Sequence, residues 1–167
     1  MRTLVGAVGY RNLRDHSAAF AVLDRLTSMN LGDDVVLEDV SYNPIAVVQW
    51  LESLEPSARF GRVILVSGFA REGRPPGAVT VSEWDRTLPP ADRIQQAITE
   101  AVTGIISLDN TLVIAGYFRA LPAHVTVVEI EPVDHAFGAE LSPAVTQAVG
   151  SATARIGELA RSSAITT

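Results

Sequence analysis

The 167-residue chain has no cysteine, and all thirteen of its basic residues are arginine. Without cysteine the protein can form no disulfide and no thiolate metal site, and it cannot use a cysteine nucleophile. The arginines are scattered along the chain without a cluster, and the formal net charge is −6. Because proteins that bind nucleic acid present a basic patch to the phosphates, we expect no nucleic-acid partner.

Long apolar runs are also missing, since none reaches the roughly 20 residues that a membrane-spanning helix needs. The amino terminus enters a strand pattern at once, from Met1 to Val5, and lacks the layout of a secretory signal peptide. We therefore expect a cytoplasmic protein with no membrane partner. Apolar residues make up 47% of the chain and charged residues 19%, as in an ordinary globular protein. The length predicts a single domain over residues 1–167.

Apolar runs of strand length alternate along the chain with segments of helical periodicity. Strands are predicted at residues 4–8, 34–40, 62–67, 78–82, 112–118 and 125–130, and helices at 17–29, 44–54, 91–106 and 143–161. This order predicts a three-layer α/β/α fold with a mostly parallel, twisted sheet of about five strands, plus a short edge strand at 78–82. In such sheets ligands bind beyond the carboxyl ends of the strands.

Polar residues at these strand ends are the candidate site residues. Asp15 and His16 precede the first helix, where Asp15 can cap the helix and His16 can bind a metal or a partner. Asp39 ends the second strand, where a carboxylate either orders the next loop or acts in the site. Ser67 and Gly68 end the third strand, where they form a turn or contact a substrate.

A nucleophilic serine at Ser67 would need an adjacent base, and no Gly-x-Ser-x-Gly motif surrounds it. Asp92, at the start of the third helix, is either a capping residue or a metal ligand. The glycines Gly6 and Gly9 do not make a dinucleotide-binding loop, because the third glycine of that motif is missing. His124 and the Asp134-His135 pair are interpreted as polar surface residues.

The layout from Leu4 to the last helix resembles the hydrogenase maturation endopeptidases. The resemblance rests on the opening strand with its Gly9-Tyr10 loop and Asp15-His16, and on a second strand that ends in Asp39. It continues through the third strand ending at Ser67, the loop closing on Pro76-Gly77, and the Leu141-Ser142-Pro143 start of the last helix. The resemblance implies a phosphorylase/hydrolase-like α/β fold and a protein partner, the large-subunit precursor of a nickel–iron hydrogenase or an assembly factor.

In that family three side chains, a Glu or Asp, an Asp and a His, are taken to meet the nickel of the precursor. The resemblance places His16 and Ser67 at the first two positions and Asp92 or Arg93 at the third. A serine hydroxyl is a weak ligand, whereas imidazole suits nickel. His16 and Asp92 are therefore the metal candidates, and Asp15, Asp39, Ser67 and Gly68 are expected to bind substrate or to order loops. No stably bound cofactor is expected, since the nickel belongs to the substrate.

Two functions follow from this layout. The chain is either a metal-dependent endopeptidase that processes the carboxyl-terminal region of the large subunit, or a non-catalytic relative that binds a hydrogenase subunit as a scaffold. The family layout favours the first function. The replacement of carboxylates by His16 and Ser67 favours the second.

Overall fold

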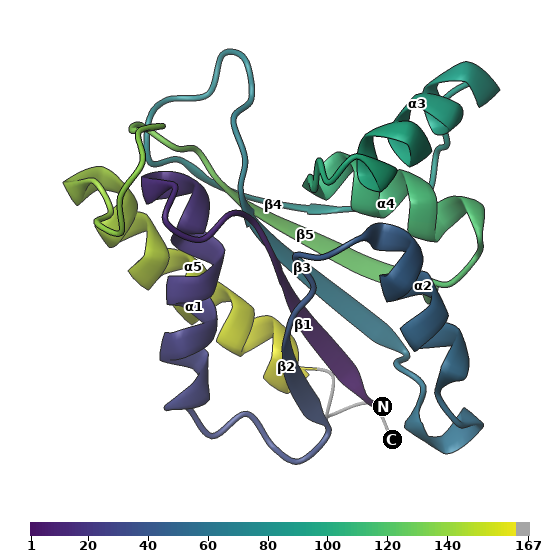
Figure 1. Ribbon diagram of the computed structural model, residues 1–167. Coiled ribbons are helices and arrows are strands. Elements are labelled where there is room, and N and C mark those ends of the chain that lie inside the picture. The colour runs from purple at the N-terminus through teal and green to yellow at the C-terminus, as the bar shows by residue number, and fades with distance from the viewer. Residues whose placement is uncertain (163–167) are drawn as a thin grey trace.

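A five-stranded sheet with helices on both faces forms the centre of the protein (Figure 1). The computed structural model describes residues 1–162, so the last five residues of the domain predicted over 1–167 lie outside it. The strand order is β2-β1-β3-β5-β4, with β4 antiparallel to its neighbour and the other strands parallel. The strands are β1 (Thr3–Val8), β2 (Val35–Asp39), β3 (Arg62–Gly68), β4 (Val79–Glu83) and β5 (His124–Ile130).

Two layers of helices cover the sheet, and alternate residues of the central strands face each layer. On one face Val5 and Ile64 pack with α1 and α5, and on the other Leu4 and Val63 pack with α2, α3 and α4. Both faces are apolar because a parallel sheet is buried on both sides. The predicted three-layer, mostly parallel fold is thereby confirmed. The helical segments are η1 (Arg14–Ser17), α1 (Ala18–Thr27), α2 (Pro44–Ser53), η2 (Pro56–Ala58), α3 (Ala91–Val102), α4 (Leu108–Tyr117) and α5 (Pro143–Ser162).

The strand predicted at residues 112–118 is wrong, because residues 112–117 belong to helix α4 and Phe118 is its C-cap. Ser107 caps the helix, its hydroxyl oxygen accepting a hydrogen bond from the backbone N–H of Asn110 at 3.1 Å. The sheet consequently has five strands including edge strand β4, one fewer than predicted. The helix predicted at 91–106 also ends early, at Val102, because Gly104 takes a positive φ of 90° that breaks the helical path.

The carboxyl ends of the parallel strands lie together at one end of the sheet, near all of the candidate residues except Asp92. The register pairs Val8 of β1 with Ser67 of β3, and Ser67 with Glu129 of β5. The loops after β3 and β5 meet η1 at this end of the sheet (Figure 1). Among residues 1–162, no helix has the length and apolar character needed to span a membrane.

Candidate functional site

A cavity of about 280 Å³ lies at the carboxyl ends of β1 and β3. Its wall is largely apolar and comes from the loop after β1, the end of β3 and the start of α4. The polar side chains in the wall include Tyr10, His16 and Ser67. The Tyr10 hydroxyl accepts a hydrogen bond from the backbone N–H of Ile106 at 2.8 Å, which ties the β1 loop to the segment before α4. The carboxyl ends of the strands, where the sequence predicted a ligand site, therefore line a pocket.

Two glycines let η1 pack directly on the strand ends and so bring His16 to this cavity. A Cβ on Gly68 would collide with the backbone oxygen of Asp15, and a Cβ on Gly9 would collide with that of His16. Any larger residue at either position would push η1 away from the sheet. Gly68 therefore has a specific role, because it allows the close approach that positions His16.

Both ring nitrogens of His16 have partners. Nδ1 lies 3.2 Å from the carbonyl oxygen of Gly68, and Nε2 lies 2.7 Å from Nδ1 of His135. A carbonyl only accepts, so the proton sits on Nδ1 of His16 and its Nε2 accepts from the N–H at Nδ1 of His135. Burial, followed by the nearby His135, lowers the pKa of His16 below its usual 6.5. His16 is accordingly neutral at physiological pH.

Asp15 is fully buried and holds the loop between β5 and α5. Its carboxylate accepts hydrogen bonds from the backbone N–H groups of Val133, Asp134 and Ser142 and from the Ser142 hydroxyl, each at 2.8 Å. Burial alone would raise the pKa of Asp15, but these donors outweigh burial and lower the pKa below its usual 3.8. Its carboxylate thus orders a loop more than 115 residues away in sequence, instead of capping the adjacent helix.

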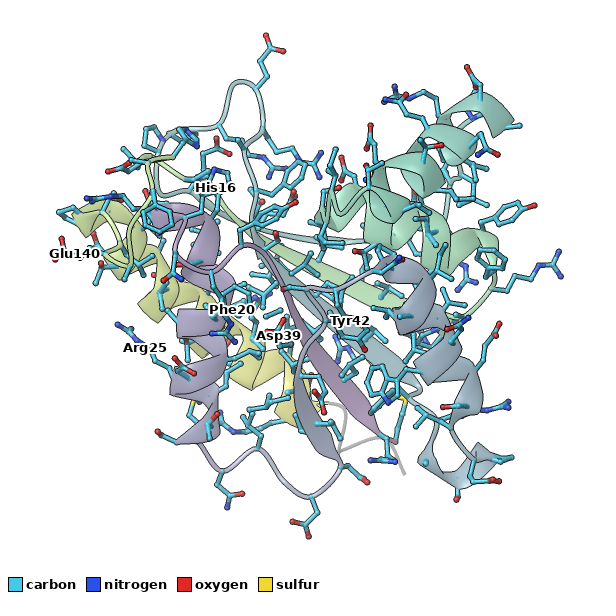
Figure 2. The ribbon with its side chains drawn as sticks, viewed as in Figure 1. His16, Phe20, Arg25, Asp39, Tyr42 and Glu140 are labelled. Carbon is cyan, nitrogen blue, oxygen red and sulfur yellow. The ribbon has the colours of Figure 1, made fainter. Side chains whose placement is uncertain are left out.

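Asp39 orders the loop that follows β2 and lies outside the lining of the cavity. Its carboxylate accepts from the backbone N–H of Ser41 at 2.9 Å and forms an ion pair with Arg11 at 3.1 Å. The Ser41 hydroxyl in turn accepts from the N–H of Gly9 and donates to Ala7. Figure 2 shows Asp39 well apart from His16. Asp39 therefore stabilises the loop after β1 without lining the cavity.

Asp92 is not part of this cavity either. It is exposed in the first turn of α3, on the side of the molecule away from η1 (Figure 1). Ser67 does line the cavity and is 2% exposed. The predicted pairing of His16 with Asp92 is thus not formed, and the structure groups His16 with Ser67 and Gly68.

His135 is exposed, as the sequence predicted for a polar surface residue, but its neighbour was not predicted. Its ring lies 5.0 Å from that of His16, measured between centroids. The two residues are 119 positions apart, so no local spacing could have indicated the pair. The indirect signal was Asp15, whose buried carboxylate fixes the loop immediately before His135.

A second charged cluster lies beside a larger cavity of about 590 Å³ between the β4–β5 edge and helices α3 and α4. Arg71 binds Asp109 through two hydrogen bonds, of 2.9 and 2.7 Å, and Glu129 through Nε at 2.7 Å. The hydrogen bonds to Asp109 are the largest cause of the raised pKa of Arg71, so the guanidinium stays charged. Because Glu129 is almost fully buried, these contacts compensate its charge and attach the β3–β4 loop to α4.

The geometry limits the chemistry available at the His16 cavity. Both ring nitrogens of His16 are engaged with Gly68 and His135, so Ser67 has no histidine base to activate it. Within residues 1–162, no group of three or more histidine, aspartate or glutamate side chains stands close enough to hold a metal. The site therefore presents two imidazoles and a hydroxyl beside an apolar pocket.

Comparison with known proteins gives a consistent relationship. No family model and no curated protein matches the sequence. Among solved structures, a hydrogenase 2 maturation peptidase from a Thaumarchaeota archaeon is 28% identical with a TM-score of 0.66, the match covering 95% of this chain and 97% of that one.

The hydrogenase maturating endopeptidase HybD from E. coli has a TM-score of 0.71 at 18% identity, covering 98% of this chain and 94% of its own. The nickel–iron hydrogenase maturation protease HybD from Thermococcus kodakarensis has a TM-score of 0.65 at 18% identity, with 96% and 99% covered. These two likenesses concern the fold, whereas the archaeal peptidase also shares sequence. Together with the layout of the sequence, they show that the chain has the fold of the hydrogenase maturation endopeptidases over nearly its whole length and resembles them.

Proposed function

We propose that the chain acts on a nickel–iron hydrogenase large-subunit precursor, binding and processing its carboxyl-terminal region at the His16 cavity. The observation that carries this proposal is the 28% identity with the archaeal maturation peptidase over 95% of the chain. The pocket at the carboxyl ends of β1 and β3 lies where α/β sheets bind ligands. The nickel enters as part of the substrate, and this chain contributes groups that recognise it.

Exposed apolar side chains close to the cavity support a protein partner. Phe137, two residues beyond His135, is 83% exposed, and Val133 in the same loop is also exposed. Tyr10, which lines the cavity, and Ile105, which precedes the lining residue Ile106, are exposed as well. Large apolar groups exposed together around a pocket are typical of a docking surface.

A non-catalytic role is the second candidate, and the composition of the pocket favours it. Ser67 offers a neutral hydroxyl at the strand end, and His16 is the only ionisable group besides Tyr10 in the wall of the described cavity. Such a pocket can bind an electron-pair acceptor but has few groups to activate water. In this case the chain would hold the precursor without cleaving it.

A precursor assay separates the two candidates. The untagged protein is incubated with nickel-loaded and with metal-free large subunit, and loss of the carboxyl-terminal peptide is followed by mass spectrometry. Cleavage of the loaded precursor supports processing, whereas a stable complex without cleavage supports the non-catalytic role. If the chain neither binds nor cleaves the precursor, both functions are wrong.

A pair of variants tests the docking surface in the same assay. Phe137→Ser is expected to weaken the complex at least tenfold, because an exposed aromatic anchor contributes more than about 1.4 kcal/mol to such an interface. Tyr117→Ser is the matched control, since Tyr117 is also exposed but ends α4 away from the cavity. An equal effect of both variants would show that the partner binds elsewhere.

A further inference from the structure

We propose that the free edge of β4, together with the cavity of about 590 Å³ beside it, binds an extended, basic segment of a protein partner, which adds to the sheet as a further strand. We call this surface the β4 groove, and it consists of Val79–Glu83 and the residues that line the cavity. The inference goes beyond the proposed function, because it concerns a second surface and holds whether or not the partner is cleaved.

The outer edge of β4 is open. β4 ends the strand order of the sheet and pairs with β5 in an antiparallel ladder. The N–H of Trp84 donates to the carbonyl of Val125 at 2.8 Å, so the backbone of Ser82 also faces β5, and the backbones of Val81 and Glu83 face outward. Within residues 1–162, these outward N–H and C=O groups have no hydrogen-bond partner. Such an edge is a template on which an extended peptide adds as a strand.

Helix α3 lies beside this edge without covering it. The buried residues of α3 are Ala97 and Ala101, which join the apolar cluster that also contains residues of α4. The cavity separates α3 from the strands, and its volume of about 590 Å³ falls within the roughly 300–1,000 Å³ typical of binding pockets. Val81 is 38% exposed at the strand edge. Alternate side chains of an added strand would point into this cavity.

The lining of the cavity carries a negative charge. Arginines number two there and acidic residues five, which gives a formal balance of −3. The acidic residues are Glu83, Asp85, Glu100, Asp109 and Glu129, and the arginines are Arg71 and Arg93. Arg71 is already bound by two of these carboxylates. Glu100 accepts hydrogen bonds from the neutral side-chain amides of Asn110 at 2.9 Å and Gln96 at 2.8 Å, which lower its pKa and keep it ionised.

Charge complementarity selects a basic occupant. An arginine or lysine side chain can place its cation near Asp85 and Glu100 and pack its aliphatic stem on Trp84 and Leu88, which line the same cavity. A second copy of this chain does not fit, because its net charge is −6 and its own β4 edge carries Glu83. Like charges placed opposite one another destabilise a strand pair.

The β4 groove adjoins the His16 cavity. Ala70 lines the His16 cavity, and the next residue, Arg71, lines the groove. In the same way Leu108 lines the first cavity and Asp109 the second. A partner that occupies the His16 cavity can therefore reach the β4 groove with a neighbouring extended segment.

NMR titration of the isotope-labelled full-length protein with a model peptide tests the proposal. The probe is a capped hexapeptide that alternates valine with arginine, and the control peptide has glutamate in place of arginine. The basic peptide should bind at least about tenfold more tightly than the acidic one and should slow hydrogen exchange at the amide of Val81.

Equal binding of the two peptides, no binding of the basic peptide, or unchanged exchange at Val81 would overturn the proposal. The same outcome follows if spermidine produces the same spectral changes as the basic peptide, since the groove would then bind small cations. Protection of the Val81 amide that rises with protein concentration, without peptide, would assign the edge to a second copy of the chain. Because the peptides replace the precursor, these results do not depend on the precursor assay.

A proline substitution tests the added strand. Val81→Pro removes the outward N–H and leaves the ladder to β5 intact, because proline is tolerated at a sheet edge where the N–H faces solvent. This variant should lose peptide binding, whereas Val81→Ala, which keeps the N–H, should retain it. Binding of the peptide to folded Val81→Pro as tightly as to the wild type would show that no strand is added. If Val81→Pro does not fold, hydrogen exchange at Val81 in the wild type decides.

A charge-matched pair of double variants tests the basic character of the occupant. Asp85→Asn with Glu100→Gln should weaken binding of the basic peptide about fivefold, because two ion contacts at a partly exposed site are lost. Asp24→Asn with Asp33→Asn makes the same change in net charge at exposed positions outside the groove and should leave binding unchanged. Equal weakening by both double variants would mean that the overall charge attracts the peptide, and the groove would be excluded.

Discussion

At the scale of single residues, Asp15 is a fully buried charge that holds a distant loop. Its buried carboxylate satisfies three backbone N–H groups and one hydroxyl of the β5–α5 loop. We expect Asp15→Ala to lower the free energy of unfolding by about 3 kcal/mol or more, because it leaves buried donors unpaired. Urea unfolding, monitored by circular dichroism, measures this change in the free energy of unfolding. Asp24→Ala, which removes an exposed aspartate of α1, should change stability by less than about 0.5 kcal/mol.

The same carboxylate predicts a pH dependence. The pKa of Asp15 is lower in the folded chain than its usual 3.8, so its contribution to stability is present above pH 3.8. The contribution is lost as the pH falls through the folded-state pKa. The stability difference between wild type and Asp15→Ala should therefore be constant near neutral pH and narrow below pH 3.8. A difference that stays constant down to low pH would contradict this assignment.

The histidine pair predicts a coupled titration. Burial and then the proximity of His135 lower the pKa of His16, so removing His135 removes one of the two causes. In His135→Ala the pKa of His16, measured as the midpoint of its titration by NMR, should rise toward 6.5. In His124→Ala it should not move. No rise in His135→Ala would mean that the two rings do not interact in solution.

These residues also show how far the sequence could specify the site. His16, Ser67 and Gly68 were found because each stands at the end of a predicted strand or at the start of a helix, and topology brings such positions together. His135 lies in a loop with no periodic signal, and the hydrogen bonds of Asp15 that place it depend on the tertiary fold. Asp92 was suggested as a metal ligand by the family resemblance alone, and the structure places it in the first turn of α3, outside the cavity.

At the scale of elements, α4 explains the main error in the predicted fold. Residues 112–118 form a short apolar run, and a run of this length fits either a strand or a helix, so periodicity could not decide between the two. Asp109 and Asn110 form the first helical turn after the cap Ser107, and a capping serine at this position is a sequence signal for a helix.

The cap gives a test of this element. Ser107→Ala removes the acceptor for the N–H of Asn110 and should destabilise the protein by about 1 kcal/mol. Ser53→Ala is the matched control, because the Ser53 hydroxyl is exposed and only donates back to Trp50 within α2. The control should change the free energy of unfolding by less than about 0.5 kcal/mol. Equal values for both variants would mean that Ser107 does not cap a helix.

At the scale of the whole molecule, the sheet lies between two apolar layers. One layer contains α1 and α5, and the other contains α2, α3 and α4 together with both tryptophans, Trp50 and Trp84. Each central strand contributes alternate residues to the two layers: Ile64 of β3 packs in the layer of α1 and α5, and Leu65 packs in the other. Because both layers pack on the same strands, we expect them to unfold together in a single transition.

The position of the tryptophans makes this prediction measurable. Ile156 of α5 is fully buried in the layer without tryptophan, so Ile156→Ala should cost about 2–5 kcal/mol. In a cooperative protein, tryptophan fluorescence from the opposite layer and far-ultraviolet circular dichroism should shift to the same lower urea midpoint. Ile105→Ala, at an exposed isoleucine, should leave both midpoints in place. A fluorescence midpoint that stays at the wild-type value while the circular dichroism transition splits would show that the sheet divides the chain into two units that unfold separately.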